Sequence, residues 1–98
     1  MDKHKSILVE AEKLVHGDRN ATYGPPWEDY ARTVGAFIAL MGPDKKISEM
    51  TPRDGMMFMV CVKLSREINL PKRDNCVDAA GYLECIQWAK DEMEAMDL

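Results

Sequence analysis

The residues best suited to chemistry lie between Lys63 and Tyr82, a stretch that reads KLSREINLPKRDNCVDAAGY. Bases and acids are mixed along it, and Leu70–Pro71 divides it in two. Positions four apart share one face of a helix, so two helix ends are expected to present one mixed-charge patch. Such a patch suits a phosphorylated ligand, with or without a metal ion. Its charged and aromatic members are Lys63, Arg66, Glu67, Lys72, Arg73, Asp74, Asp78 and Tyr82.

The basic members of the patch favour phosphate recognition. The planar guanidinium groups of Arg66 and Arg73 suit bidentate contacts to phosphate oxygens, and the side chains of Lys63 and Lys72 supply point charges. The ring of Tyr82 can stack on a nucleobase. A solvated network of ion pairs, for example between a lysine and an acid four residues along, is the structural alternative and stays open.

A second group of candidate residues lies in the segment HGDRNATYGPP, which begins at His16. Its glycines, asparagine and prolines break regular structure, so the segment is predicted to be a loop. Arg19 and Tyr23 are its candidate ligand-binding groups. We expect this loop to form a pocket together with the junction near Leu70–Pro71.

Composition narrows the range of partners. The chain has 98 residues and is interpreted as one domain, residues 1–98. Its formal net charge of -4 argues against duplex DNA or an anionic membrane as the main partner. The longest apolar run, Met56–Val62, is far too short to span a bilayer. The first residues are polar, so we expect no signal peptide and a location in the cytoplasm of a bacterial host cell.

The cysteines do not predict a metal site. Cys61, Cys76 and Cys85 form no CxxC pair and no zinc-type spacing with histidine. Their neighbours are apolar, so we interpret all three as buried thiols in a reducing compartment.

Helix signals divide the chain into four segments. Ser6 can cap a helix over 6–16, and a second helix should begin near Pro26 and stop at Gly42–Pro43. Thr51, followed by a proline and by an acid three residues after the cap, predicts the start of a third helix that ends near residue 70. The fourth helix is expected over about 74–96, with Asp74 as its cap.

Apolar periodicity indicates how these helices pack. The stripe that begins at Trp27 and Tyr30 is expected to face the core, with these two side chains as anchors. Met56–Val62 is apolar on all sides, which is typical of a central helix. A heptad-like seam over 79–96 indicates subunit contacts, because so small a chain has a modest core. The fold class is therefore predicted to be all-α, a compact four-helix bundle that assembles as a homo-oligomer.

Three segments together resemble a known family. HGDRNATYG, KLSRE and KRDNCVDAAGY match the pattern GDR…YG…K..RE…K.DN..D.AGY of small phage and prophage proteins of uncharacterised function. The resemblance covers the chain from Ile7 to about Ile86.

A more distant resemblance is to the MazG-like all-α nucleoside triphosphate pyrophosphohydrolases. Those enzymes hold Mg²⁺ with an ExxE pair and an ExxD pair of carboxylates, because Mg²⁺ prefers oxygen ligands. Glu67 matches the second acid of the first pair, whereas Leu64 occupies the position of the first. Asp78 matches the final acid of the second pair. Asn75 occupies the position of the first acid of that pair, three residues earlier, and Asp74 is next to it. The resemblance thus implies Glu67, Asp74 and Asp78 as the metal ligands of such an enzyme.

Three functions follow as expectations. The first is binding of a small phosphorylated ligand, most naturally a nucleotide. In a phage, such a protein would sequester a nucleotide second messenger used in host defence. The second is a Mg²⁺-dependent nucleotide pyrophosphohydrolase with a reduced set of carboxylates. The third is a structural or protein-binding helical bundle. Convergent carboxylates would favour the enzyme, and a basic pocket would favour the binding protein. A cluster of charges that pair with one another would favour the structural role.

Overall fold

The computed structural model describes residues 6–17 and 22–96. Within these ranges the chain is helical with no strand, which confirms the all-α class. The long helices are α1 (Ile7–His16), α3 (Pro26–Met41), α4 (Pro52–Asn69) and α5 (Arg73–Ala95), and a short 3₁₀ helix, η1 (Ile47–Glu49), lies between α3 and α4. None of the described helices is both long and apolar enough to cross a membrane.

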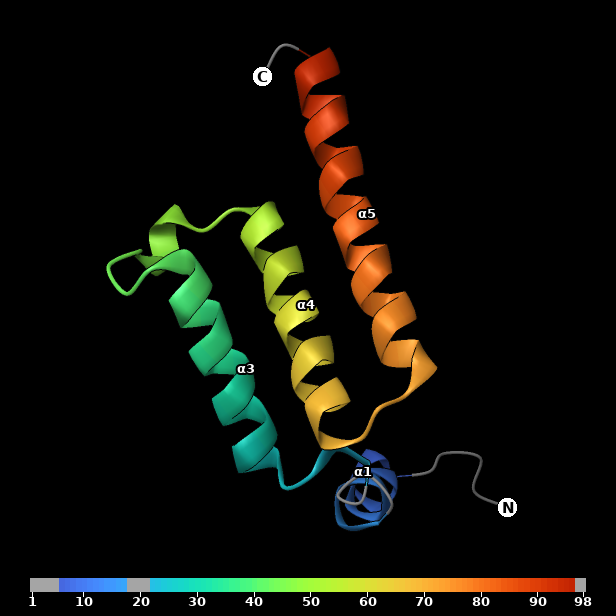
Figure 1. Ribbon diagram of the computed structural model, residues 1–98. Coiled ribbons are helices and arrows are strands. Elements are labelled where there is room, and N and C mark those ends of the chain that lie inside the picture. Colours follow the sequence, from blue (N-terminus) through green and yellow to red (C-terminus); the bar gives the residue numbers. More distant parts are fainter. Residues whose placement is uncertain (1–5, 18–21, 97–98) are drawn as a thin grey trace.

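The three longest helices form one layer with α4 in the middle, and successive helices run in opposite directions (Figure 1). Within the described ranges, α3 and α5 each pack only on α4, and α1 packs on none of the other helices. Figure 1 shows α1 end-on, beyond the end of the layer where α4 stops. The single chain is therefore more open than the expected compact bundle: its radius of gyration is 17.1 Å, against about 13 Å for a compact chain of this length.

Helix starts follow the local signals closely. Ser6 Oγ accepts a hydrogen bond from the Leu8 N–H at 3.2 Å. At the start of α4, Thr51 Oγ1 accepts from the Asp54 N–H at 3.3 Å, and Asp54 Oδ2 accepts from the Thr51 N–H at 3.0 Å. This reciprocal pair is the predicted capping arrangement. The Lys45 ammonium, 2.8 Å from Asp54 Oδ2, extends the arrangement into the connection after α3.

The start of α5 corrects one prediction. Asp74 is not its cap: Lys72 occupies the N-cap position, and its side chain makes no capping bond. The acceptor comes instead from the preceding helix, because Glu67 Oε1 accepts the Lys72 N–H at 2.8 Å. A carboxylate at the end of α4 thus satisfies a free backbone donor of α5 and fixes the turn between them.

The core is small and centred on α4, as its all-round apolar composition predicted. Val60, Cys61 and Val62 are its buried apolar residues among those described. The rings of Phe37 and Phe58 meet edge to face, with centroids 5.2 Å apart, and join α3 to α4. The prediction of three buried thiols is wrong for Cys76 and Cys85, which are exposed because the single α5 packs on α4 alone.

The orientation of α3 is the reverse of the prediction. Trp27 and Tyr30 are not core anchors, since their exposed fractions are 74% and 42%. The side of α3 that faces α4 carries instead Asp29 and Thr33, both almost fully buried. The physical reason is that partners on α3 and α4 satisfy these polar groups, so the polar side of the helix can be covered.

The predicted seam of α5 is used within the chain. Ala79, Tyr82, Ile86 and Ala89 are partly buried, and α4 is the helix that covers them. Met93 and Met96, at the end of α5, are exposed. In Figure 1 this end of α5 projects past the start of α4.

Candidate functional site

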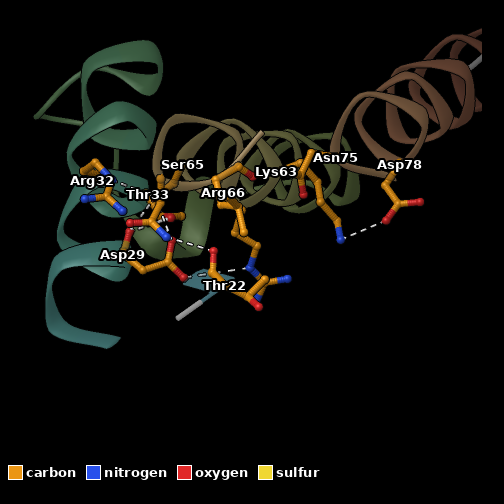
Figure 2. Close-up of polar contacts among 11 residues, drawn as sticks. Thr22, Asp29, Arg32, Thr33, Lys63, Ser65, Arg66, Asn75 and Asp78 are labelled. Carbon is orange, nitrogen blue, oxygen red and sulfur yellow. Dashed lines mark hydrogen bonds and ion pairs between the residues drawn. The ribbon is translucent and has the colours of Figure 1, made fainter. Parts of the chain in front are cut away.

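Asp29 is the centre of a polar cluster between α3 and α4 (Figure 2). The hydroxyl oxygen of Ser65 lies 2.7 Å from Asp29 Oδ1 and 3.0 Å from the Asp29 backbone oxygen. A hydroxyl carries a single hydrogen, and we assign it to the shorter bond with the carboxylate. The hydroxyl of Thr33 donates to the same backbone oxygen at 3.0 Å. Asp29 is therefore tied to both helices.

Two arginines flank this buried acid. Arg32 Nε donates to Ser65 Oγ at 3.2 Å. Arg66 Nε lies 3.8 Å from Asp29 Oδ2, close enough for an ion pair but too far for a hydrogen bond. Arg32 Nη2 and Arg66 Nε are both buried, and neither has a hydrogen-bond partner among the described residues. Two guanidinium groups against one carboxylate leave a surplus of one positive charge.

The first loop joins the same region from the other side. The guanidinium carbon of Arg66 lies 4.3 Å from the centre of the Tyr23 ring, a cation–π contact. Asn69 Nδ2 donates to the Thr22 backbone oxygen at 2.8 Å. The end of the loop therefore lies against the end of α4, the neighbourhood expected from the sequence. A ligand role for Tyr23 and Arg66 stays a prediction, and Arg19 lies outside the described residues.

Gly24 allows this close approach. Its φ of +76° lies in the left-handed region, which disfavours other residues. A Cβ at this position would lie 2.9 Å from Asn69 Oδ1. The loop can therefore cross the end of α4 at this distance because residue 24 has no side chain.

A second cluster joins α4 to α5. Lys63 Nζ lies 2.9 Å from Asp78 Oδ2, so Lys63 pairs across the two helices and not with Glu67 on its own helix. Glu67 Oε1 accepts from Asn75 Nδ2 at 3.0 Å and from the Lys72 N–H. These bonds, that from Asn75 first, hold the pKa of the Glu67 carboxyl below its usual value.

The structure divides the predicted patch into two parts. Arg66 turns toward α3 and Tyr23, whereas Lys63 and Asp78 face each other on the α5 side (Figure 2). Lys72, Arg73 and Asp74 are exposed at the start of α5. Asp78 and the partly buried Tyr82 lie beside a shallow, open depression of α5 that is also lined by Val77, Gly81 and Cys85.

The carboxylates implied by the MazG resemblance do not converge in the single chain. Among the described residues, no group of three or more His, Cys, Asp or Glu side chains lies close enough to hold a metal ion. Glu67 is used in the turn before α5, and Asp78 is paired with Lys63.

The sequence interpretation missed Asp29, Arg32 and Ser65. Asp29 and Thr33 are four apart on the side of α3 opposite the apolar stripe, a side expected to face solvent. One available signal was Ser65, which shortly follows the longest apolar run of the chain. A polar residue next to a buried segment needs a partner, and Asp29 provides it.

A comparison with protein-family models gives one assignment. Residues 6–89 match a domain of unknown function, DUF6378. The chain belongs to the DUF6378 family. The match includes α1, α3, α4 and most of α5, and with them every described residue of both polar clusters.

Two phage proteins are similar to this DUF6378 chain. The Gene 55 protein of Mycobacterium phage D29 is 34% identical over 89 residues, which cover 90% of this chain and 56% of that protein. The Gene 55 protein of Mycobacterium phage L5 is 36% identical over 91 residues, 89% of this chain and 56% of that protein. The chain thus spans about half the length of these relatives. They agree with the expected resemblance to phage proteins, whereas the MazG resemblance stays a prediction. No solved structure matches significantly.

Proposed function

We propose that this DUF6378 protein binds a small phosphorylated molecule, with a nucleotide as the best-fitting class, between α3, the end of α4 and the first loop. The observation that carries the proposal is the pair Arg32 and Arg66. Each presents a buried N–H donor with no hydrogen-bond partner among the described residues. Unsatisfied buried donors are rare and costly in folded proteins, and phosphate oxygens are strong acceptors for guanidinium groups.

Charge supports an anionic ligand at this place. The chain as a whole is acidic, yet Arg32 and Arg66 outnumber the single acid between them. Asp29 orients the guanidinium groups through Ser65 and through the ion pair. A phosphate that bound both arginines would therefore meet donors already held in position, which lowers the entropy cost of binding.

The aromatic ring favours a nucleotide over inorganic phosphate. Tyr23 already packs on the Arg66 guanidinium, and a planar base can extend such a stack. Lys72 and Arg73, which are exposed at the start of α5, would hold further phosphate groups of a longer ligand, and Lys63 would have to leave its ion pair with Asp78 to join them. Because two relatives are phage proteins, we extend the proposal to sequestration of a nucleotide second messenger used in host defence.

Binding is favoured over turnover. The described carboxylates form no cluster of the size that a MazG-like Mg²⁺ site needs, so we do not propose a pyrophosphohydrolase. A purely structural role for the arginines is the competing explanation, and the experiment has to separate it from binding.

The test is isothermal titration with a panel of mononucleotides and cyclic dinucleotides, each with and without Mg²⁺. Arg66→Lys is the sharpest variant, because it keeps the positive charge beside Asp29 and removes the planar fork. A charge-assisted hydrogen bond contributes roughly 1.5–3 kcal/mol, so the affinity should fall about tenfold to a hundredfold.

Arg53→Lys is the matched control, since Arg53 is exposed at the start of α4. It should bind as the wild type does. Thermal unfolding of both variants reports any loss of stability separately from binding. Wild-type affinity in Arg66→Lys, or no nucleotide bound by the wild type, would leave Arg66 with a structural role only.

A further inference from the structure

The outward side of α3 carries an apolar stripe that no described part of the chain covers. Its members recur at helical spacing, and the largest, Trp27, is 74% exposed. Tyr30, Val34 and Ile38 are each more than 40% exposed. Opposite them, Asp29 and Thr33 are buried against α4. An exposed apolar side on a helix whose polar side is buried indicates that another surface packs on the apolar side.

The total exposed area of the chain shows whether a contact of useful size is available. The chain exposes 7809 Å², whereas a folded monomer of this mass exposes roughly 5,700 Å². The difference is about 2,100 Å², within the area that each partner buries in an obligate homodimer, about 1,000–2,500 Å². The chain as a whole therefore leaves enough surface uncovered for a stable dimer, and the stripe on α3 shares this excess with exposed apolar residues of α1 and α5.

We propose that the outward face of α3 is a homodimer interface, in which a second copy packs its own α3 antiparallel on the first, about a twofold axis near Val34. Val34 is the midpoint of the stripe, which extends from Trp27 to Met41. An antiparallel arrangement places the aromatic end of one stripe, Trp27 and Tyr30, against the aliphatic end of the other. Large aromatic side chains are enriched among the residues that contribute most to the binding energy of interfaces.

Charge favours self-association through this face and sets its direction. Between Ala31 and Met41 the only charged residue is Arg32, and its Nε is directed to Ser65 on α4. The centre of the interface therefore buries no unpaired charge. Glu28 is exposed at the start of α3. A parallel pairing would bring the Glu28 carboxylates of the two copies together, whereas the antiparallel pairing keeps them at opposite ends.

The interface is independent of the proposed ligand site, because the stripe and the Asp29 cluster lie on different sides of α3. Sedimentation velocity on the unliganded chain therefore tests it alone. We expect the wild type to sediment with twice the chain mass of 11.1 kDa. Val34→Glu should weaken the dimer by roughly a hundredfold or more, because it buries two carboxylates near the twofold axis.

Ile47→Glu is the matched control. Ile47 is also a β-branched aliphatic residue, one carbon larger than Val34, and is 86% exposed, but it lies in η1, away from the stripe. This variant should remain dimeric. Circular dichroism should show both variants to be as helical as the wild type, since neither residue is buried in the chain.

Cross-linking tests the position of the axis without adding a charge. In a background of Cys76→Ser and Cys85→Ser, Val34→Cys should form an intermolecular disulfide on mild oxidation, because the residue meets its own copy. Ile47→Cys should form none. A monomeric wild type, or a dimer that survives Val34→Glu and is not cross-linked by Val34→Cys, would overturn the proposal.

Discussion

The Ser65 hydroxyl donates to the Asp29 carboxylate at 2.7 Å and joins α4 to α3 across 36 positions of sequence. Both side chains are buried, and Arg32 in turn donates to the same hydroxyl. The contact between these helices thus depends on directional hydrogen bonds as well as on the apolar contact of Phe37 with Phe58.

Ser65→Ala should destabilise the fold. It leaves a buried carboxylate without its shortest hydrogen bond and Arg32 Nε without an acceptor. We expect the free energy of unfolding to fall by roughly 1–3 kcal/mol, measured by urea denaturation. Ser48→Ala, at an exposed position of η1, should change it by less than about 0.5 kcal/mol. Equal losses in the two variants would mean that the Asp29 cluster contributes little to stability.

Gly24→Ala and Gly55→Ala should have opposite effects. Gly24 has a φ of +76°, and a Cβ there would lie 2.9 Å from Asn69 Oδ1, so alanine should cost about 1–2 kcal/mol or more. Gly55 lies inside α4 with open space around its Cβ position, so alanine should stabilise the helix by about 0.5–1 kcal/mol. Thermal unfolding of the two variants decides it. A neutral Gly24→Ala would show that the loop can retreat from Asn69.

Asp54 should make stability depend on pH. The side chain of Lys45 and then the Thr51 N–H hold the pKa of the Asp54 carboxyl below its ordinary value of 3.8. Because the pKa is lower in the folded state, ionised Asp54 stabilises the fold at pH values above its ordinary pKa of 3.8. The stabilisation is lost as the pH falls through the folded-state pKa.

Urea midpoints of the wild type and Asp54→Asn, measured from pH 7 to pH 2, test this dependence. Their difference should be largest near neutrality and should narrow below pH 3.8. The same difference should be smaller when both proteins also carry Lys45→Gln, because this change removes the largest cause of the lowered pKa of Asp54. A difference that stays constant over this range would contradict the assignment.

The three thiols should react at very different rates. Cys76 and Cys85 are exposed, whereas Cys61 is 1% exposed and burial raises the pKa of its thiol. The thiolate is the reactive form, so Cys61 should be labelled only through opening of the fold. Mass spectrometry after brief treatment with a thiol reagent should show two labels, and a third only in denaturant. Rapid labelling of Cys61 in native protein would show that the α4 core is open.

The ends of the helices could be predicted from the sequence because the signals that set them are local. Ser6 caps α1, and Thr51 with Asp54 caps α4, as their spacing indicated. Asp74 was the exception. The group that satisfies the start of α5 belongs to Glu67, on the preceding helix, and the pattern of capping residues does not show such a partner.

The site was harder to predict because its contacts depend on which side of each helix faces another. Periodicity located the apolar stripe of α3 but did not show what covers it. The pairs Lys63–Asp78 and Arg66–Asp29 were missed for the same reason, since each depends on a helix orientation that spacing within one helix does not fix.

The two helix contacts of α4 also differ in the order in which they can form. Glu67 reaches its α5 partners five and eight residues away, whereas Asp29 and Ser65 are separated by 36. Closing a longer loop costs more chain entropy, so the hairpin of α4 and α5 should form first and α3 should dock afterwards. During synthesis the order of emergence is the reverse. Helix α3 therefore emerges before its partner, and the Asp29 carboxylate stays solvated until Ser65 has left the ribosome.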